Sequence, residues 1–181
     1  MATILPIKTA EQLWASPDLG PCELVRGQLV MMSPAGFEHG RVVGRLHVFL
    51  ANYVNASGLG VVTGARTGFV IERDPDTVRA ADVAFVRSER VPAEDAVGFF
   101  DGAPDLAVEV ISPGDRTSEV ASKVEMWLAC GCQAVWVVEP GPRNATVHTP
   151  RGAERLASAD FLKADDLLPG LSVAVSDVFA R

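Results

Sequence analysis

The chain has 181 residues, of which 48% are hydrophobic and 22% charged, and its formal net charge is −7. These values are typical of one globular domain over residues 1–181, and no apolar run is long enough for a membrane span. The acidic charge argues against tight nonspecific binding to DNA, although a metal ion and clustered arginines can supply positive charge locally. Three cysteines and the absence of a signal-peptide pattern favour a reducing, cytoplasmic location.

The first third of the chain predicts a short helix, a hairpin and a long helix. A capping box over residues 9–12 opens a helix through Trp14. Residues 22–32 form the pattern of a hairpin that turns at Arg26-Gly27. From Glu38 the apolar residues take helical spacing, and this helix ends near residues 57–58.

The rest of the chain predicts strands around one further helix. Strands are expected at residues 59–63, 67–72, 82–86, 106–111, 134–138 and 145–149, with a turn at 74–76, an irregular stretch over 88–102 and a short apolar segment in the tail. The helix is expected from Thr117 or Ser118 to Cys130. The order indicates an α/β (α+β) fold, a mixed β-sheet flanked by helices, preceded by the N-terminal helix and hairpin.

Glu109 is the most informative residue, because it lies in the middle of strand 106–111, which is apolar on both faces like a central, covered strand. A lone buried carboxylate is costly, so Glu109 should be protonated, paired with a cation or bound to a metal. The pairing alternative would use an arginine such as Arg66 or Arg79.

Asp82 is a second carboxylate, at the start of strand 82–86. Alone it could be a turn residue. Together with Glu109 it gains weight, because two carboxylates on neighbouring strands are a common way to hold Mg²⁺ or Mn²⁺.

Lys123 borders the apolar stripe of the helix that follows the Glu109 strand. Its ammonium could reach back over the strand end to orient a water or to stabilise phosphate charge. The alternative is a surface lysine paired with Glu119.

Glu38 precedes Val42 by four residues and can face inward, although a capping role at a helix N-terminus is an alternative. Glu23 is a weaker candidate for the same role. His39 and His47 are more typical of structural or surface residues than of metal ligands, and Cys130-Gly131-Cys132 lacks the second pair of a zinc site. Arg41 and Arg45 share a helix face and could contact phosphates or simply be solvated.

Short motifs follow one another in a specific order over nearly the whole chain. They are Cys22-Glu23-Leu24-Val25-Arg26-Gly27, Ser33-Pro34, Glu38-His39-Gly40, Asp82-Val83-Ala84-Phe85-Val86, Pro104-Asp105-Leu106-Ala107-Val108-Glu109-Val110-Ile111, Glu119, Lys123, Trp127, Gly131, Val135-Trp136-Val137-Val138-Glu139-Pro140 and Leu168-Pro169-Gly170-Leu171. In order and spacing they resemble the Uma-type family of proposed restriction endonucleases, which is placed in the PD-(D/E)xK nuclease superfamily.

The resemblance implies a restriction-endonuclease-like core and Mg²⁺-dependent (or Mn²⁺-dependent) hydrolysis of phosphodiester bonds in DNA. Carried over by position, Asp82, Glu109 and the backbone carbonyl of Val110 would hold the metal. Lys123 would position the attacking water or neutralise charge, and Glu38 would be the helix carboxylate.

Two positions depart from the family's pattern. Ala81 stands where a proline usually precedes the aspartate, and Ile111 stands where the motif lysine is expected two residues after the acid. The family resembled here places its lysine on the following helix, at the position of Lys123. Its members also usually carry Asp and Tyr near Glu119 and Trp127.

Three functions are therefore weighed. The first is a metal-dependent DNA endonuclease, for which a homodimer with paired sites would suit double-strand cutting. The second is a non-catalytic binding or assembly module that keeps the carboxylates as a salt-bridged core, which the acidic charge favours. The third is a hydrolase of small phosphoesters, which a narrow pocket would favour.

Overall fold

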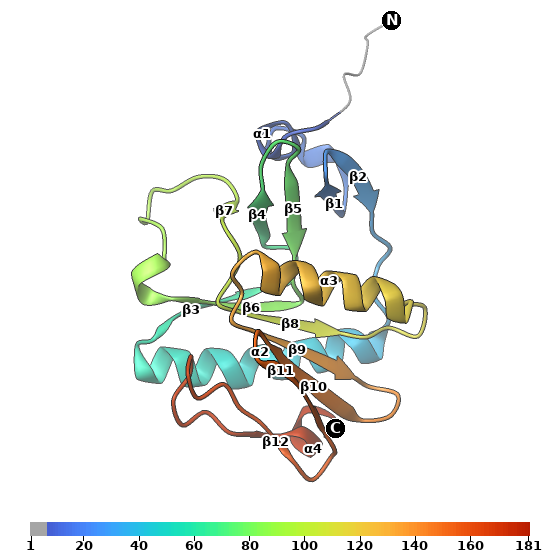
Figure 1. Cartoon of the computed structure of the whole chain (residues 1–181), viewed down its shortest axis with the longest axis vertical. Helices are drawn as coiled ribbons and strands as arrows, with labels where there is room; N and C mark the ends of the chain where they lie inside the picture. Colours follow the sequence, from blue (N-terminus) through green and yellow to red (C-terminus); the bar gives the residue numbers. More distant parts are fainter. Residues whose placement is uncertain (1–6) are drawn as a thin grey trace, which may run out of the picture.

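The computed structural model describes residues 7–181 (Figure 1). Residues 1–6, on which the absence of a signal peptide partly rests, lie outside the described range. None of the helices described combines the length and the apolarity needed to cross a bilayer.

The structure has four α-helices, two 3₁₀ turns and thirteen strands over residues 7–181. The helices and turns are α1 (Ala10–Trp14), η1 (Pro17–Leu19), α2 (Phe37–Ser57), η2 (Ser88–Arg90), α3 (Thr117–Ala129) and α4 (Val175–Val178). The strands are β1 (Cys22–Val25), β2 (Gln28–Met31), β3 (Gly60–Gly64), β4 (Gly68–Glu72), β5 (Thr77–Ala80), β6 (Val83–Arg87), β7 (Phe100–Asp101), β8 (Leu106–Val110), β9 (Ala134–Glu139), β10 (Asn144–Thr149), β11 (Gly152–Leu156), β12 (Phe161–Leu162) and β13 (Val173–Ala174).

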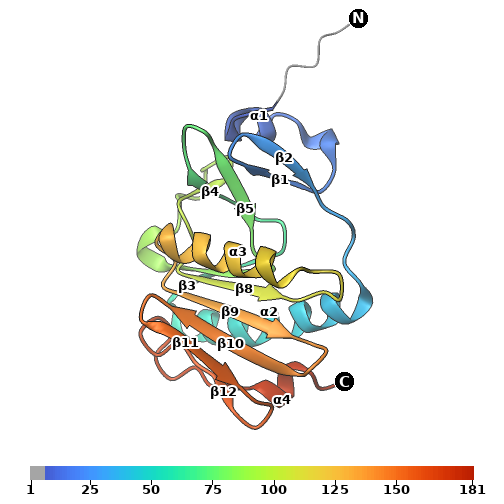
Figure 2. The same cartoon turned by 45° about the vertical axis from the view of Figure 1, so that its right-hand side comes forward.

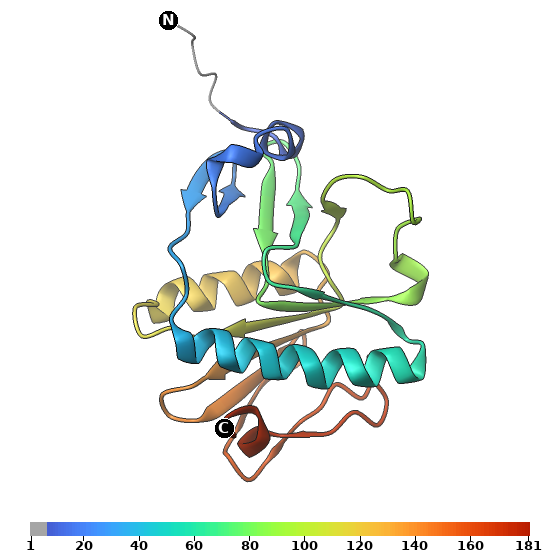
Figure 3. The same ribbon diagram turned by 180° about the vertical axis from the view of Figure 1, so that it is seen from behind.

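The main sheet has six strands in the order β11-β10-β9-β8-β6-β3. It is mixed, because β8 and β9 are parallel whereas β6 runs antiparallel to β8. Helices α2 and α3 lie on opposite sides of this sheet (Figures 1 and 3). The predicted mixed sheet with flanking helices is confirmed, and all five residues of β8 are buried as expected of a central strand.

Alternation along β8 sends its side chains into two separate cores. Leu106, Val108 and Val110 pack with the buried stripe of α2, and Ala107 packs on the other face with Trp127 of α3. Glu109 has the same parity as Ala107. Its carboxylate is therefore directed to the α3 face.

A second sheet lies beyond α3, in the order β2-β1-β5-β4-β7, with α1 at its far end (Figures 1 and 2). One of the passages of the chain from this sheet to the main sheet lies at Ala81 and Asp82, between β5 and β6. Asp82 is fastened to the main sheet by its backbone N–H, which donates to the carbonyl of Val108 at 3.0 Å. The transition thus places Asp82 next to the strand that carries Glu109.

Among the strands that were not predicted separately, the longest are β5 and β11. β5 has only four residues and pairs with both β1 and β4, so that the hairpin of residues 22–31 joins a second sheet. β11 contains Glu154 and Arg155 and has four exposed residues out of five, which gives no apolar alternation to detect. It pairs with β10 and forms one edge of the main sheet.

The α2 layer offers a direct test of the core. Leu50 is completely buried, whereas Val48 on the same helix is largely exposed. We expect Leu50→Ala to lower the free energy of unfolding by about 2–5 kcal/mol, because it leaves a cavity against the main sheet. Val48→Ala should stay within about 0.5 kcal/mol of the wild type. Urea denaturation followed by circular dichroism measures both, and equal effects would contradict the assigned face of α2.

Candidate metal centre

The Glu109 carboxylate is held by two donors from the same face of α3. Lys123 Nζ donates to Oε2 at 2.8 Å, and the indole Nε1–H of Trp127 donates to Oε1 at 2.8 Å. The two donors are four residues apart, one helical turn, so both reach the same carboxylate. The prediction that Lys123 reaches back over the strand is confirmed, and the alternative pairing with Glu119 is wrong, since Glu119 lies 3.7 Å from Arg116 instead.

Burial dominates the electrostatics of this pair. It raises the pKa of Glu109 above its ordinary value, and Asp82 acts in the same direction while Lys123 opposes it. Burial acts to lower the pKa of Lys123, but Glu109 and Glu23 outweigh it and the pKa stands above its ordinary value. Lys123 therefore remains a cation, in contact with a carboxylate that is costly to keep charged.

Glu23 belongs to the wall of this centre. Its Oε2 accepts from Arg79 at 2.6 Å, and its Oε1 accepts from the backbone N–H of Ala80 at 2.9 Å. Lys123 donates to the carbonyl of Ala80 at 3.0 Å and lies 3.9 Å from Glu23. Arg79 thus pairs with Glu23, and the alternative that it pairs with Glu109 is wrong.

Asp82 approaches the end of β8 from the crossing between the two sheets. Its Oδ2 accepts from the backbone N–H of Val110 at 2.8 Å and lies 3.2 Å from Nε2 of His39. Its other oxygen, Oδ1, makes no hydrogen bond within residues 7–181, and the side chain is 21% exposed. Asp82 therefore keeps one carboxylate oxygen open beside Val110, whose backbone carbonyl was predicted to be a metal ligand.

His39 is a site residue that the sequence did not single out. The Asp82 carboxylate beside it raises the pKa of His39, although burial opposes this. Its Nδ1 is buried and has no hydrogen-bond partner in the described part of the chain. The sequence did hold a signal for His39, because it lies three residues before the buried Val42. On a helix this spacing indicates the inward face as well as the spacing of four residues between Glu38 and Val42 does.

Glu38 does not face inward, and that expectation is wrong. Its side chain is 51% exposed and forms an ion pair with Arg41, with 2.6 Å between Oε1 and Nη2. The reason is local: Arg41 stands three residues later and holds the carboxylate on the outer side of the first turn. The same guanidinium, and beyond it Arg181 and Arg143, holds the pKa of Glu38 below its ordinary value.

Arg41 and Arg45 fasten α2 to the C-terminal segment. Arg41 donates to the carbonyls of Phe179 and Ala180, and Arg45 donates to the carbonyl of Asp177 at 2.7 Å. These contacts occupy N–H groups that could otherwise bind phosphates. Neither residue is simply solvated.

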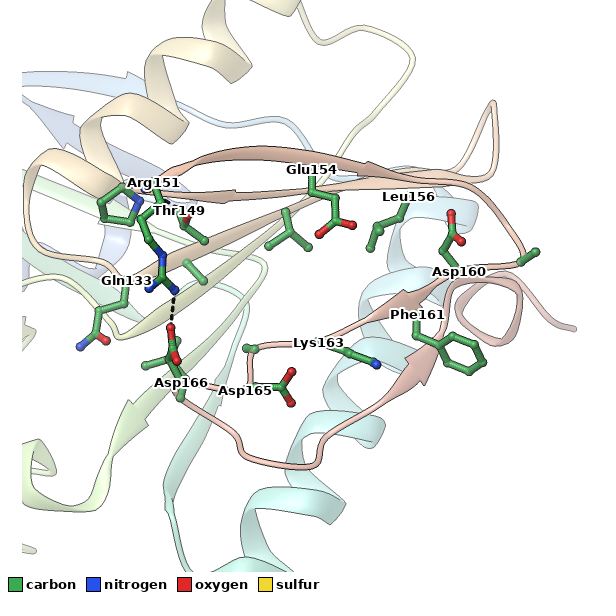
Figure 4. Close-up of a pocket in the computed structure, with 16 residues that line it drawn as sticks. Gln133, Thr149, Arg151, Glu154, Leu156, Asp160, Phe161, Lys163, Asp165 and Asp166 are labelled. Atoms are coloured by element: carbon green, nitrogen blue, oxygen red, sulfur yellow. Dashed lines mark hydrogen bonds and ion pairs between the residues drawn. The ribbon is translucent and has the colours of Figure 1, made fainter.

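A cavity of about 900 Å³ lies away from these carboxylates, between the β10–β11 hairpin and the loop of residues 159–167 (Figure 4). Arg151 forms an ion pair with Asp166 across it. The charged residues of its lining are Arg151, Lys163, Glu154, Asp160, Asp165 and Asp166. Two positive and four negative side chains disfavour a phosphoester there, so this cavity gives no support to a hydrolase of small phosphoesters.

The donor set near Asp82 fits a hard divalent cation. Within residues 7–181 no three His, Cys, Asp or Glu side chains gather as a ready metal shell. Mg²⁺ does not require one, because it is commonly bound through one or two carboxylates with waters and substrate phosphates. Asp82 offers its open oxygen, whereas Glu109 would have to share an oxygen with Lys123 or Trp127. A bound cation would relieve the mutual repulsion of the Asp82 and Glu109 carboxylates.

Comparison with known proteins shows the family and the fold of the chain. The model of the Uma2 family, described as "Putative restriction endonuclease", matches residues 10–176. A crystal structure described as "a putative nuclease belonging to DUF820 from Anabaena variabilis ATCC 29413" is similar, with a TM-score of 0.83 and 18% identity over 96% of this chain and 98% of that chain. At that identity the likeness shows the fold. No curated protein matches significantly.

The Glu109–Lys123 pair can be tested by Lys123→Met. We expect the free energy of unfolding to fall by about 3 kcal/mol at pH 7, because the substitution leaves Glu109 buried without its cation. The loss should shrink as the pH falls from 7 towards 4.5, the ordinary pKa of Glu109, because the folded variant then binds a proton that the unfolded chain does not yet hold.

Urea denaturation at several pH values measures this effect. Lys163→Met, which removes an exposed lysine, is the matched control and should change stability by less than about 0.5 kcal/mol. A loss that is independent of pH, or no loss at all, would contradict the buried pair.

Proposed function

Because the chain belongs to the Uma2 family, we propose that it is a Mg²⁺-dependent (or Mn²⁺-dependent) endonuclease that hydrolyses phosphodiester bonds of DNA. The observation that carries the proposal is the meeting of Asp82 and Glu109 at the end of β8, with Lys123 bonded to Glu109. We also propose a cytoplasmic location, since all three cysteines are free thiols.

Asp82, Glu109 and the carbonyl of Val110 are the groups that would hold the ion. When bound, it would supply Lewis acidity to the phosphodiester and to the attacking water. Val110 contributes in two ways. Its carbonyl would be a ligand of the ion, and its N–H already fixes the orientation of the Asp82 carboxylate.

The chain's own cations do the rest. Lys123 is held by the carbonyl of Ala80 and by Glu109, so its ammonium is oriented before substrate arrives. In that position it can stabilise negative charge that develops on the phosphate. His39 holds Asp82 from the α2 side and fixes which carboxylate oxygen stays open.

The decisive experiment combines metal binding with cleavage. Calorimetry should show one or two Mn²⁺ ions bound to the wild type, and plasmid DNA should be cut in Mg²⁺ or Mn²⁺ but not in EDTA. Asp82→Asn and Glu109→Gln should lose Mn²⁺ binding and slow cleavage by at least about a hundredfold. Glu125→Gln, which changes an exposed carboxylate on α3, is the control and should behave as wild type. Folded wild type that binds no Mn²⁺ would sink the proposal.

A second comparison separates His39 from Glu38, which we keep as a proposed catalytic residue only on the family resemblance. We expect His39→Ala to lower cleavage about tenfold or more, because Asp82 loses the partner that orients it. Glu38→Ala should lower it less, because the Glu38 side chain pairs with Arg41 instead. Initial rates on plasmid DNA measure both, and the reverse order would restore Glu38 as the helix carboxylate.

Two observations favour a second candidate, a non-catalytic binding or assembly module. Glu109 is satisfied by Lys123 and Trp127 without any metal, as a salt-bridged core would be. The open edge of β2 carries exposed Val30 and Met31 and no charged residue, which suits pairing with a second copy. The same Mn²⁺ titration discriminates the two candidates, since only the nuclease requires the ion. We propose the homodimer for either function.

A further inference from the structure

A cavity of about 310 Å³ lies beside the first turn of α2. The β9–β10 turn and the C-terminal residues form its other walls. Its charged lining consists of Glu38, Arg41, Arg143 and Arg181. The side chains of three arginines and one glutamate thus line this cavity, in a chain whose net charge is −7.

The three arginines are not equivalent. Arg41 is committed to Glu38 and to two backbone carbonyls. Arg143 has no carboxylate partner within residues 7–181, and its bond to the carbonyl of Phe179 is long, at 3.5 Å. Its guanidinium lies 5.8 Å from the centre of the Phe179 ring, a cation–π contact that holds the group while most of its N–H donors stay open. Arg181 is exposed and is in no ion pair of the described residues.

The cavity adjoins the candidate metal centre through two consecutive residues. Glu38 lines the cavity, and the next residue, His39, contacts Asp82. The cavity and the Asp82 carboxylate therefore both lie at the N-terminal end of α2.

We propose that this cavity binds a backbone phosphate of the nucleic-acid strand that reaches the Asp82 and Glu109 carboxylates, with Arg143 and Arg181 as the donors. The proposal rests on the proposed function for the identity of the ligand. Arginine suits the role, because its fork of N–H groups matches a phosphate bidentately. The acidic lining of the larger cavity supports the assignment, since it leaves the arginine cavity as the favourable one for phosphate.

The test is binding of a fluorescein-labelled DNA duplex, followed by anisotropy in EDTA over a series of KCl concentrations. Arg143→Ala and Arg181→Ala should each weaken binding about three- to tenfold near 0.1 M salt, and each should reduce the salt slope by about 1. The double variant should show both effects combined. Arg155→Ala removes the same charge from an exposed position on β11 and should leave the affinity and the slope close to wild type.

Two further variants and one assay keep the outcome clear. Arg143→Lys should retain the salt slope, and Arg181→Ala remains informative if Arg143→Ala fails to fold. Unchanged affinity and slope in the double variant, or a wild type that binds no duplex, would overturn the inference. Cleavage is measured separately in Mg²⁺. If the wild type cuts DNA and the arginine variants bind and cut as it does, the phosphate site in the cavity is refuted and the nuclease function stands. If the wild type cuts nothing but the double variant loses duplex binding, the nuclease function is refuted and the phosphate site stands.

Discussion

The buried Glu109 carboxylate requires two hydrogen-bond donors. The contacts that supply these donors and hold them in place join three parts of the chain. Trp127 and Lys123 come from one face of α3, and Lys123 also donates to Ala80, where the chain leaves the small sheet. One hydrogen-bonded cluster therefore joins β8, α3 and the crossing between the sheets. A buried pair of this kind is weak evidence for stability, because desolvation offsets much of its attraction. It does fix geometry, and the Asp82 carboxylate depends on the position of that crossing.

Charge in this protein is separated by location. The overall charge is negative, and the larger cavity is lined mainly by carboxylates. Under the proposed function, Lys123 and the pair of Arg143 and Arg181 are the positive groups that would meet the phosphate chain. An acidic chain of this kind binds nucleic acid weakly at random positions, since phosphate contacts supply most of the nonspecific affinity. Contacts confined to one end of the central strands of the main sheet would bring a nucleic-acid strand to the carboxylates without a broadly basic surface.

The sequence was sufficient to place the side chains of Glu109 and Lys123 because each position follows from a local period, whereas Asp82 drew attention only through its neighbour Glu109. Parity along β8 fixes the face of Glu109, and the spacing from Trp127 fixes that of Lys123. It was insufficient at the start of α2, where Glu38 and His39 both fit the apolar stripe and only the rotation of the helix on the sheet decides between them. The role of Arg41 depends on carbonyls more than 130 residues away, which no local pattern reveals. β11 was missed because its residues are held by pairing with β10, and their own apolarity contributes little.

The charged residues of β11 also determine how the main sheet can meet its own copy. Glu154 lines the larger cavity on one face, whereas Arg155 lies 4.0 Å from Glu139 on the other. In a twofold antiparallel pairing, opposed residues share a face, so their numbers must add to an even sum. A register centred on Glu154 sets Glu154 against itself, one centred on Arg155 sets Arg155 against itself, and one centred on Ala153 sets Arg155 against Arg151. Each central register is therefore self-repelling, and this edge of the six-stranded sheet is protected from pairing with its own copy.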